Sequence, residues 1–423
     1  MAWKIRVSDL YLIKKDSIVV ALFYGAMLLV YFWSLHPWFL WKVESFVPIV
    51  AGLLCLASMA LSRTMDNPVF TRKEYLFPII SFVLLIFYER MVNGVNINGF
   101  IVDCFHVLVF LTLFRFPNER LKNLSTVIAK TMATLLAFSL LGHFMYLMGF
   151  PLPGGHDAQY NEFYSFTNYY LFLLDDRNLF TLVPRFNSVF LEPGHIGTAA
   201  VFLLFIQRGQ WRKWYNIVLM TAAFFSFSLA AYIFFVIIVF LNMWIERKRI
   251  AQKLLISLLL LAGAVIATFT YNKGNNLVHD LIALRLEMED GEMEGDNRVT
   301  FDFDAEFESF LQSSDILFGR EMDKSSFGNA GYRVYIYENG FVGLVFLLLF
   351  YISVFMYARN YRALLSAMFL ALLYFIVNAF MIWENIFMPF YIATYMVSTF
   401  HRKGTRDSLT ESYPLETQTI VQS

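Results

Sequence analysis

The sequence predicts an all-α integral membrane protein with about twelve transmembrane helices and two long loops on the outer side of the membrane. Of its 423 residues, 58% are hydrophobic, and the mean hydropathy is +0.56. A soluble protein of this length could not bury so much apolar surface, so lipid must cover much of the chain. Apolar runs of membrane-spanning length and an uneven distribution of Lys and Arg support the same fold class.

The apolar runs give twelve candidate spans, because a helix needs about 17–25 apolar residues to cross a bilayer. The seventh candidate is short, and SFSLAAY at 226–232 predicts a tight reversal between two short helices. We expect a single polytopic membrane domain over residues 1–423. The candidate spans are 18–36, 46–62, 75–91, 99–114, 124–149, 188–206, 215–228, 229–245, 254–271, 335–357, 363–380 and 386–400.

The basic residues predict the orientation. With the N-terminus in the cytoplasm, the cytoplasmic segments hold 22 of the 33 Lys and Arg residues, and the outer segments hold ten. Cytoplasmic loops normally carry such an excess. Twelve spans return the tail, 401–423, to the cytoplasm, so both termini are expected there. The 33 basic and 33 acidic residues cancel, so the net charge indicates no nucleic-acid partner.

Two outer connections, 150–187 and 272–334, are too long to be simple turns. Loops longer than about 12–15 residues in compact proteins are usually functional or disordered. In the second loop, the apolar residues from Phe303 to Leu311 recur at helical spacing, with acidic residues on the other faces. This pattern predicts an amphipathic helix that rests on the membrane surface or on the first loop.

The segment RFNSVFLEPGHIG, residues 185–197, places polar side chains, including His195, directly before the sixth apolar run. Pro193 fits the first turn of a helix, so it either begins the span at Glu192 or kinks a helix that began earlier. Free N–H groups at a helix N-terminus attract phosphate oxygens, and the Arg185 guanidinium can bind a phosphate through two parallel hydrogen bonds. In a simpler interpretation, Arg185 only reaches lipid headgroups and Glu192 only caps the helix.

The second long loop supplies further polar residues at the same boundary. Arg298 begins the predicted amphipathic helix, and Tyr332, Arg333 and Glu338 lie where the chain enters the tenth span. Each long loop therefore brings arginine and carboxylate to the same side of the membrane. We expect a single outward-facing site made from both loops.

Other polar and reactive residues are left out of this site. Asp103 and His106 share one face of the fourth span, which favours either a proton relay or hydrogen bonds between helices. Cys55 and Cys104 provide neither a disulfide framework nor metal-ligand spacing.

Four stretches resemble, in the same order, segments of the polysaccharide polymerase and O-antigen ligase superfamily of bacterial inner membranes. Together they cover roughly residues 180–355, and the twelve-span layout fits the rest of the chain. The stretches are the Glu-Pro segment RFNSVFLEPGHIGTAAVFLL, the short hairpin FSFSLAAYIFF, the arginine-led loop helix NRVTFDFDAEFESFLQSSDILFGR, and the start of the next span, NAGYRVYIYENGFVGLVFLLLF.

Within this superfamily, ligases typically carry a histidine about eleven positions before the glycine that corresponds to Gly340. This sequence has Asn329 at that position, followed by Gly331 and Tyr332. Polymerases often have Asp-x-Gly-Tyr there, so the resemblance favours a polymerase, with asparagine in place of aspartate as a departure.

The resemblance implies glycosyl transfer at the periplasmic face, in which a growing glycan leaves undecaprenyl diphosphate and joins the terminal sugar of another lipid-linked repeat unit. The expected catalytic residues are Arg185 and Arg298, which stabilise the leaving diphosphate, and Glu192, which acts as general base or holds the arginines. The expected substrate-binding residues are His195, Asn329, Tyr332, Arg333 and Glu338. No nucleotide, metal or other cofactor is implied, because the donor arrives activated.

The implied partners are the lipid bilayer and undecaprenyl-diphosphate-linked glycans, with a chain-length regulator and a flippase as further candidates. Two alternative functions remain open: a ligase that transfers glycan to lipid A-core, and a flippase for the same lipid-linked sugar. A flippase should carry charge down to the bilayer midplane and often contains inverted repeats. In this sequence the charge gathers at one face and in two outer loops.

Overall fold

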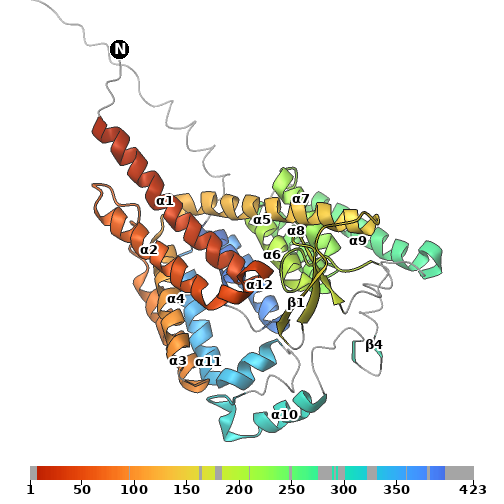
Figure 1. Ribbon diagram of the computed structural model, residues 1–423. Helices are drawn as coiled ribbons and strands as arrows, with labels where there is room; N and C mark the ends of the chain where they lie inside the picture. The colour runs from red at the N-terminus through yellow and green to blue at the C-terminus, as the bar shows by residue number, and fades with distance from the viewer. Residues whose placement is uncertain are drawn as a thin grey trace, which may run out of the picture.

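The computed structural model is a bundle of helices with a small β-sheet beside it (Figure 1). Two of the predicted site residues, Arg298 and Asn329, lie outside the part of the chain that the structure describes. The described residues are 7–94, 96–161, 164–176, 183–208, 210–246, 250–274, 288–289, 292–293, 301–321, 331–358, 360–378 and 382–395.

A helix overlaps each of the twelve predicted spans. In chain order these helices are α1 (Val7–Trp33), α2 (Val47–Arg63), α3 (Leu76–Val92), α4 (Ile97–Arg115), α5 (Asn118–Leu147), α6 (Pro193–Ile206), α7 (Trp214–Phe225), α8 (Leu229–Glu246), α9 (Ile250–Thr270), α11 (Tyr332–Phe355), α12 (Tyr361–Val377) and α13 (Glu384–Tyr395).

In the described part of the chain, five helical stretches are long and apolar enough to cross a membrane. Large apolar side chains also cover the exterior, such as Leu53 at 53% exposure and Phe87 at 58%. The chain is therefore mostly helical, and its apolar helices indicate a membrane-embedded protein. The number of crossings and their direction stay predictions. The five stretches are Lys15–Trp33, Trp38–Arg63, Ile97–Arg115, Asn118–Leu147 and Tyr332–Phe355.

Local sequence signals set several helix starts. The Asn96 side chain accepts a hydrogen bond from the Asn98 backbone N–H at 3.0 Å and so caps α4. Asn360 caps α12 in the same way through the Ala363 backbone N–H at 3.2 Å. These side chains satisfy N–H groups that have no partner within the first turn of a helix.

The centre of the bundle is aromatic. Phe82, Phe110, Phe350 and Phe387 come from α3, α4, α11 and α13 and are each at most 1% exposed. Their ring centroids lie 4.1 Å apart for Phe82 and Phe110 and 5.2 Å apart for Phe350 and Phe387. Stacked and tilted rings at these separations pack favourably, so this cluster holds four helices from distant parts of the chain together.

The all-α prediction was wrong in both long loops, and the larger departure is in the first. The first loop contains an antiparallel sheet of β1 (His156–Asn161), β2 (Tyr164–Asn168) and β3 (Leu173–Asp175), in the order β1-β2-β3. Phe166 of β2 and Leu173 of β3 are buried and pack with Leu191 and Trp41, which lie outside the loop strands. These strands are short, and packing outside the loop stabilises them, so the local pattern gives little sign of them.

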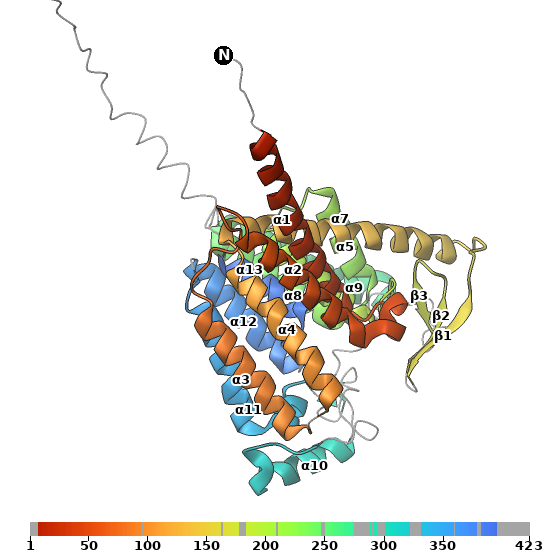
Figure 2. The ribbon, with the colours of Figure 1, turned by 60° about the vertical axis from the view of Figure 1, so that its left-hand side comes forward.

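A second unpredicted element, the 3₁₀ helix η1 (Trp38–Phe46), connects α1 to α2. The Trp38 backbone N–H donates to the Val189 carbonyl at 2.9 Å, and Pro37 forms a β-bridge with Phe190. The start of η1 is thereby fixed to the segment before α6, and the sheet packs against both of these segments. In both views the sheet and α10 (Phe301–Leu311) lie away from the labelled N-terminus (Figures 1 and 2).

The predicted amphipathic helix in the second long loop is confirmed as α10. Phe303 and Phe310 are fully buried, whereas Leu311 is 42% exposed. The buried face packs on Val334 and Tyr337 in the first part of α11. The prediction that this helix rests on the membrane surface or on the first loop was therefore wrong for its aromatic face, which packs on α11.

The end of this loop docks on a kink in α11. Gly340 has φ +64° and ψ −176°, a conformation that side chains with a Cβ rarely adopt. The kink lets the Val342 N–H donate to the Leu317 carbonyl at 3.0 Å, and the Arg320 N–H donates to the Tyr337 carbonyl at 2.7 Å. Between α9 and α11 the described residues also form η3 (Tyr271–Gly274), the paired strands β4 (Met288–Glu289) and β5 (Glu292–Met293), and, after α10, η6 (Ser314–Ile316).

Candidate functional site

Pro193 begins α6, so the first of the two predicted roles for this proline is confirmed. Glu192 precedes it in an extended conformation, with φ −129° and ψ 138°. The chain leading to Glu192 is fixed from two sides: the Leu173 N–H donates to the Ser188 carbonyl at 2.6 Å, and the Ser188 hydroxyl donates to the Ser139 hydroxyl at 2.8 Å. The approach to the helix is therefore determined by the sheet and by α5.

Glu192 occupies the N-cap position of α6, but its side chain makes no capping hydrogen bond. Its carboxylate accepts a hydrogen bond from the Tyr164 hydroxyl of β2, and its other oxygen lies 3.7 Å from Nε2 of His195. The Glu192 side chain is 33% exposed and that of His195 is 13% exposed. A carboxylate and an imidazole thus lie together at the polar end of a buried apolar helix.

Arg185 is held by the short hairpin that the sequence predicts at 226–232. Its Nε–H donates to the Ser226 carbonyl at 3.2 Å, and the Phe186 backbone N–H donates to the Phe225 carbonyl at 3.0 Å. The hairpin therefore orients Arg185 by a contact within the protein.

The same hairpin packs closely on α6 because Gly197 has no side chain. A Cβ at Gly197 would lie 2.6 Å from the Ser226 hydroxyl oxygen and 2.7 Å from the Ala231 Cβ. One turn earlier, a Cβ at Gly194 would meet only the Ser228 hydroxyl oxygen, at 3.8 Å. Close approach at Gly197 sets the position of the start of α6 relative to the turn that holds Arg185.

Of the residues predicted from the second loop, the structure describes Tyr332, Arg333 and Glu338, which lie in the first part of α11. The Arg333 guanidinium is 5.8 Å from the Phe307 ring centroid, a cation–π contact with α10. The Tyr332 ring lies 6.5 Å from Phe375 of α12, and Glu338 lies two residues before the Gly340 kink. Arg333 and Tyr332 thus contact α10 and α12, whereas the Glu192–His195 pair is bound to the sheet through Tyr164. A single site made from both loops stays a prediction.

Sequence reasoning missed a polar and aromatic cluster on η1. Glu44 accepts hydrogen bonds from His36 and, at 3.2 Å, from the Tyr160 hydroxyl of β1. Burial and the Glu44 carboxylate raise the pKa of Tyr160 to about 12, so this hydroxyl stays protonated and can donate at neutral pH. The Trp41 indole N–H donates to the His36 carbonyl at 2.9 Å, and its ring lies 5.2 Å from Tyr160.

Trp383 connects this cluster to the start of α6. Its ring lies 5.1 Å from that of His36 and 5.7 Å from that of His195, in edge-to-face geometry in both cases. The histidines of two histidine–carboxylate pairs, His36 with Glu44 and His195 with Glu192, therefore contact the same tryptophan ring.

A third histidine–carboxylate pair lies deeper, next to Trp383 in the chain. Glu384 is 1% exposed, and its carboxylate lies 3.6 Å from Nε2 of His106. The neighbouring Asp103 is bound by Arg90 of α3 through bonds of 2.5 and 3.1 Å. For Asp103, the expected hydrogen bond between helices is confirmed. The sequence offered one signal for this pair, because Glu384 is an acidic residue with apolar stretches on both sides.

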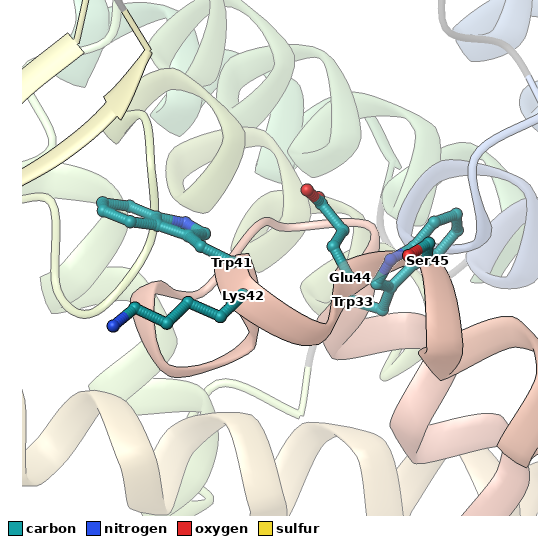
Figure 3. Close-up of a pocket in the computed structure, with 5 residues that line it drawn as sticks. All are labelled: Trp33, Trp41, Lys42, Glu44 and Ser45. Atoms are coloured by element: carbon teal, nitrogen blue, oxygen red, sulfur yellow. The ribbon is translucent and has the colours of Figure 1, made fainter.

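An open pocket of ≈ 360 Å³ lies on η1 beside the first of these pairs. Its lining residues are Trp33, Trp41, Lys42, Glu44 and Ser45. Figure 3 shows Glu44 between Trp41 and Trp33, with Lys42 beside Trp41.

Comparison with known proteins gave no relative: no family model matches the chain, and neither a curated protein nor a solved structure does.

Proposed function

We propose that this protein is a polysaccharide polymerase that joins undecaprenyl-diphosphate-linked oligosaccharide repeat units at the outer face of a bacterial inner membrane. The observation that carries the proposal is the Glu192–His195 pair at the start of α6, held by Tyr164. Arg185 lies seven residues before Glu192 and is bound to the 226–232 hairpin through the Ser226 carbonyl. The ordered resemblance over residues 180–355 supports the same reaction class.

In the proposed reaction, a hydroxyl oxygen of the acceptor sugar forms a bond to the anomeric carbon of the donor, and the bond from that carbon to the diphosphate breaks. The hydroxyl proton moves to Glu192, which lies within reach of His195 as a second acceptor. The electron pair leaves with undecaprenyl diphosphate, and the arginines stabilise its growing charge. Arg185, oriented by its bond to the hairpin, serves this role, and Arg298 is assigned the same role by the resemblance alone.

The cellular test is deletion of the gene. A polymerase deletion leaves surface glycan of a single repeat unit. Long chains retained on the lipid carrier would indicate a ligase, and single units trapped on the cytoplasmic side would indicate a flippase. Either of these two outcomes rejects the proposal.

Glu192→Gln tests the site itself, because it keeps the shape of the side chain and removes its basicity. We expect a folded protein with little polymer, measured as the glycan ladder at matched protein level. The matched control is Glu308→Gln on α10, which removes an exposed carboxylate from the same chain. A Glu192→Gln variant with normal ladders would reduce Glu192 to a positioning residue.

A further inference from the structure

None of the residues that line the pocket on η1 has been assigned a role in the proposed reaction. The pocket is lined by two tryptophans, a carboxylate, an amine and a hydroxyl. Pockets for small ligands typically measure about 300–1,000 Å³ and combine apolar walls with a few polar groups. At ≈ 360 Å³ this pocket is at the small end of that range.

The polar group at the centre of the pocket is oriented before any ligand arrives. His36 and Tyr160 each donate to a different oxygen of Glu44. Each carboxylate oxygen can accept a second hydrogen bond, so Glu44 keeps acceptor capacity. The Glu44 side chain is 24% exposed. A fixed, partly exposed acceptor of this kind suits a ligand with adjacent hydroxyl donors.

The aromatic wall is fixed in the same way. The Trp41 indole N–H is bound to the His36 carbonyl, and its ring packs 5.8 Å from Phe166 of β2. Trp33, on the other side of Glu44, has its ring 5.1 Å from His106. Rigid tryptophan faces give apolar contact area to a ligand at little cost in side-chain entropy.

The pocket is also connected to the proposed reaction site. Glu44 binds His36, the His36 ring contacts Trp383, and the Trp383 ring contacts His195, the partner of Glu192. Two rings, those of His36 and Trp383, therefore separate a ligand bound to Glu44 from His195 at the start of α6.

We propose that the pocket lined by Trp33, Trp41, Lys42, Glu44 and Ser45 binds a sugar residue of the acceptor glycan, with Glu44 accepting hydrogen bonds from adjacent ring hydroxyls and Trp41 contacting the apolar face of the ring. This assignment rests on the proposed function for the identity of the glycan. The binding itself is measured without turnover.

The test uses the purified full-length protein in nanodiscs and oligosaccharides released by mild acid from the surface glycan of the host cells. Saturation-transfer NMR and titration give contact and Kd. We expect Glu44→Gln to weaken binding about 10-fold or more, since hydrogen bonds to charged groups contribute more than neutral ones. Trp41→Phe is expected to weaken binding less, because part of the ring face remains.

The matched control is Phe39→Ala. Phe39 is on the same helix, is 49% exposed and is not among the pocket residues, so its loss should leave Kd unchanged. Thermal unfolding of each variant separates lost binding from lost folding. Absence of binding by the wild-type protein, or an unchanged Kd in a folded Glu44→Gln variant, overturns the assignment.

The two proposals fail separately. If deletion of the gene leaves polymer intact while Glu44→Gln still weakens binding, the proposed function fails and the sugar pocket stands. If deletion gives single repeat units while Glu44→Gln binds and polymerises normally, the pocket assignment fails and the polymerase stands.

Discussion

The contact between α6 and the 226–232 hairpin gives the sharpest test of the structure. In Gly197→Ala, the new methyl group would lie 2.6 Å from the Ser226 hydroxyl oxygen and 2.7 Å from the Ala231 Cβ. The hydroxyl can rotate away, but the Ala231 Cβ is fixed to the backbone of α8, so the hairpin or the start of α6 must shift. Overpacking of this kind typically costs about 1–3 kcal/mol.

Gly194→Ala is the matched control in the same helix. Its methyl group would meet only the Ser228 hydroxyl oxygen, at 3.8 Å, which is ordinary van der Waals contact. Replacing glycine by alanine inside a helix otherwise gains up to about 1 kcal/mol. We therefore expect Gly194→Ala to hold or raise the apparent Tm, and Gly197→Ala to lower it.

Thermal unfolding in one detergent, followed by tryptophan fluorescence, measures the difference between the two variants. Glycan ladders from cells carrying each variant give a second readout, because a shift at Gly197 also moves Glu192 relative to Arg185. Equal Tm values and equal ladders for the two variants would refute the close packing of the hairpin on α6.

Two further predictions concern charge. Arg185→Ala and Arg298→Ala should each lower polymer formation about 10²–10³-fold at normal protein level, which is the typical effect of losing one donor to a developing anion. Lysine at either position should restore activity only partly, because it cannot form two parallel hydrogen bonds to a phosphate. Normal ladders in both alanine variants would mean that these arginines only contact lipid headgroups. Tags after Arg406 and within 285–296 should label from opposite sides of the membrane, as the basic asymmetry predicts; labelling of 285–296 only from the cytoplasm would contradict the topology.

The helices could be predicted because each needs a long apolar run, which is visible without knowing the fold. The amphipathic helix α10 followed from the spacing of Phe303, Phe307 and Phe310, although its support on α11 did not. That support depends on Gly340, whose backbone angles bring two distant segments together. Long-range contact of this kind leaves little trace in local sequence.

The site was predicted only in part, for the same reason. Glu192 and His195 stood out because a Glu-Pro segment precedes an apolar run. Glu44 and His36 did not, because each is one polar residue among aromatic ones, and only the sheet brings Tyr160 to them. Trp383 could not be predicted either, because it contacts two histidines that are far apart in the chain.

The most direct measurement of the central claim is reconstituted polymerisation. Purified full-length protein in liposomes is supplied with undecaprenyl-diphosphate-linked repeat units extracted from cells that lack the gene, and the products are separated by size. We predict a ladder of two or more units with release of undecaprenyl diphosphate, and its loss in Glu192→Gln. Unchanged single units with folded wild-type protein, or an equal ladder from Glu192→Gln and wild type, would contradict the account.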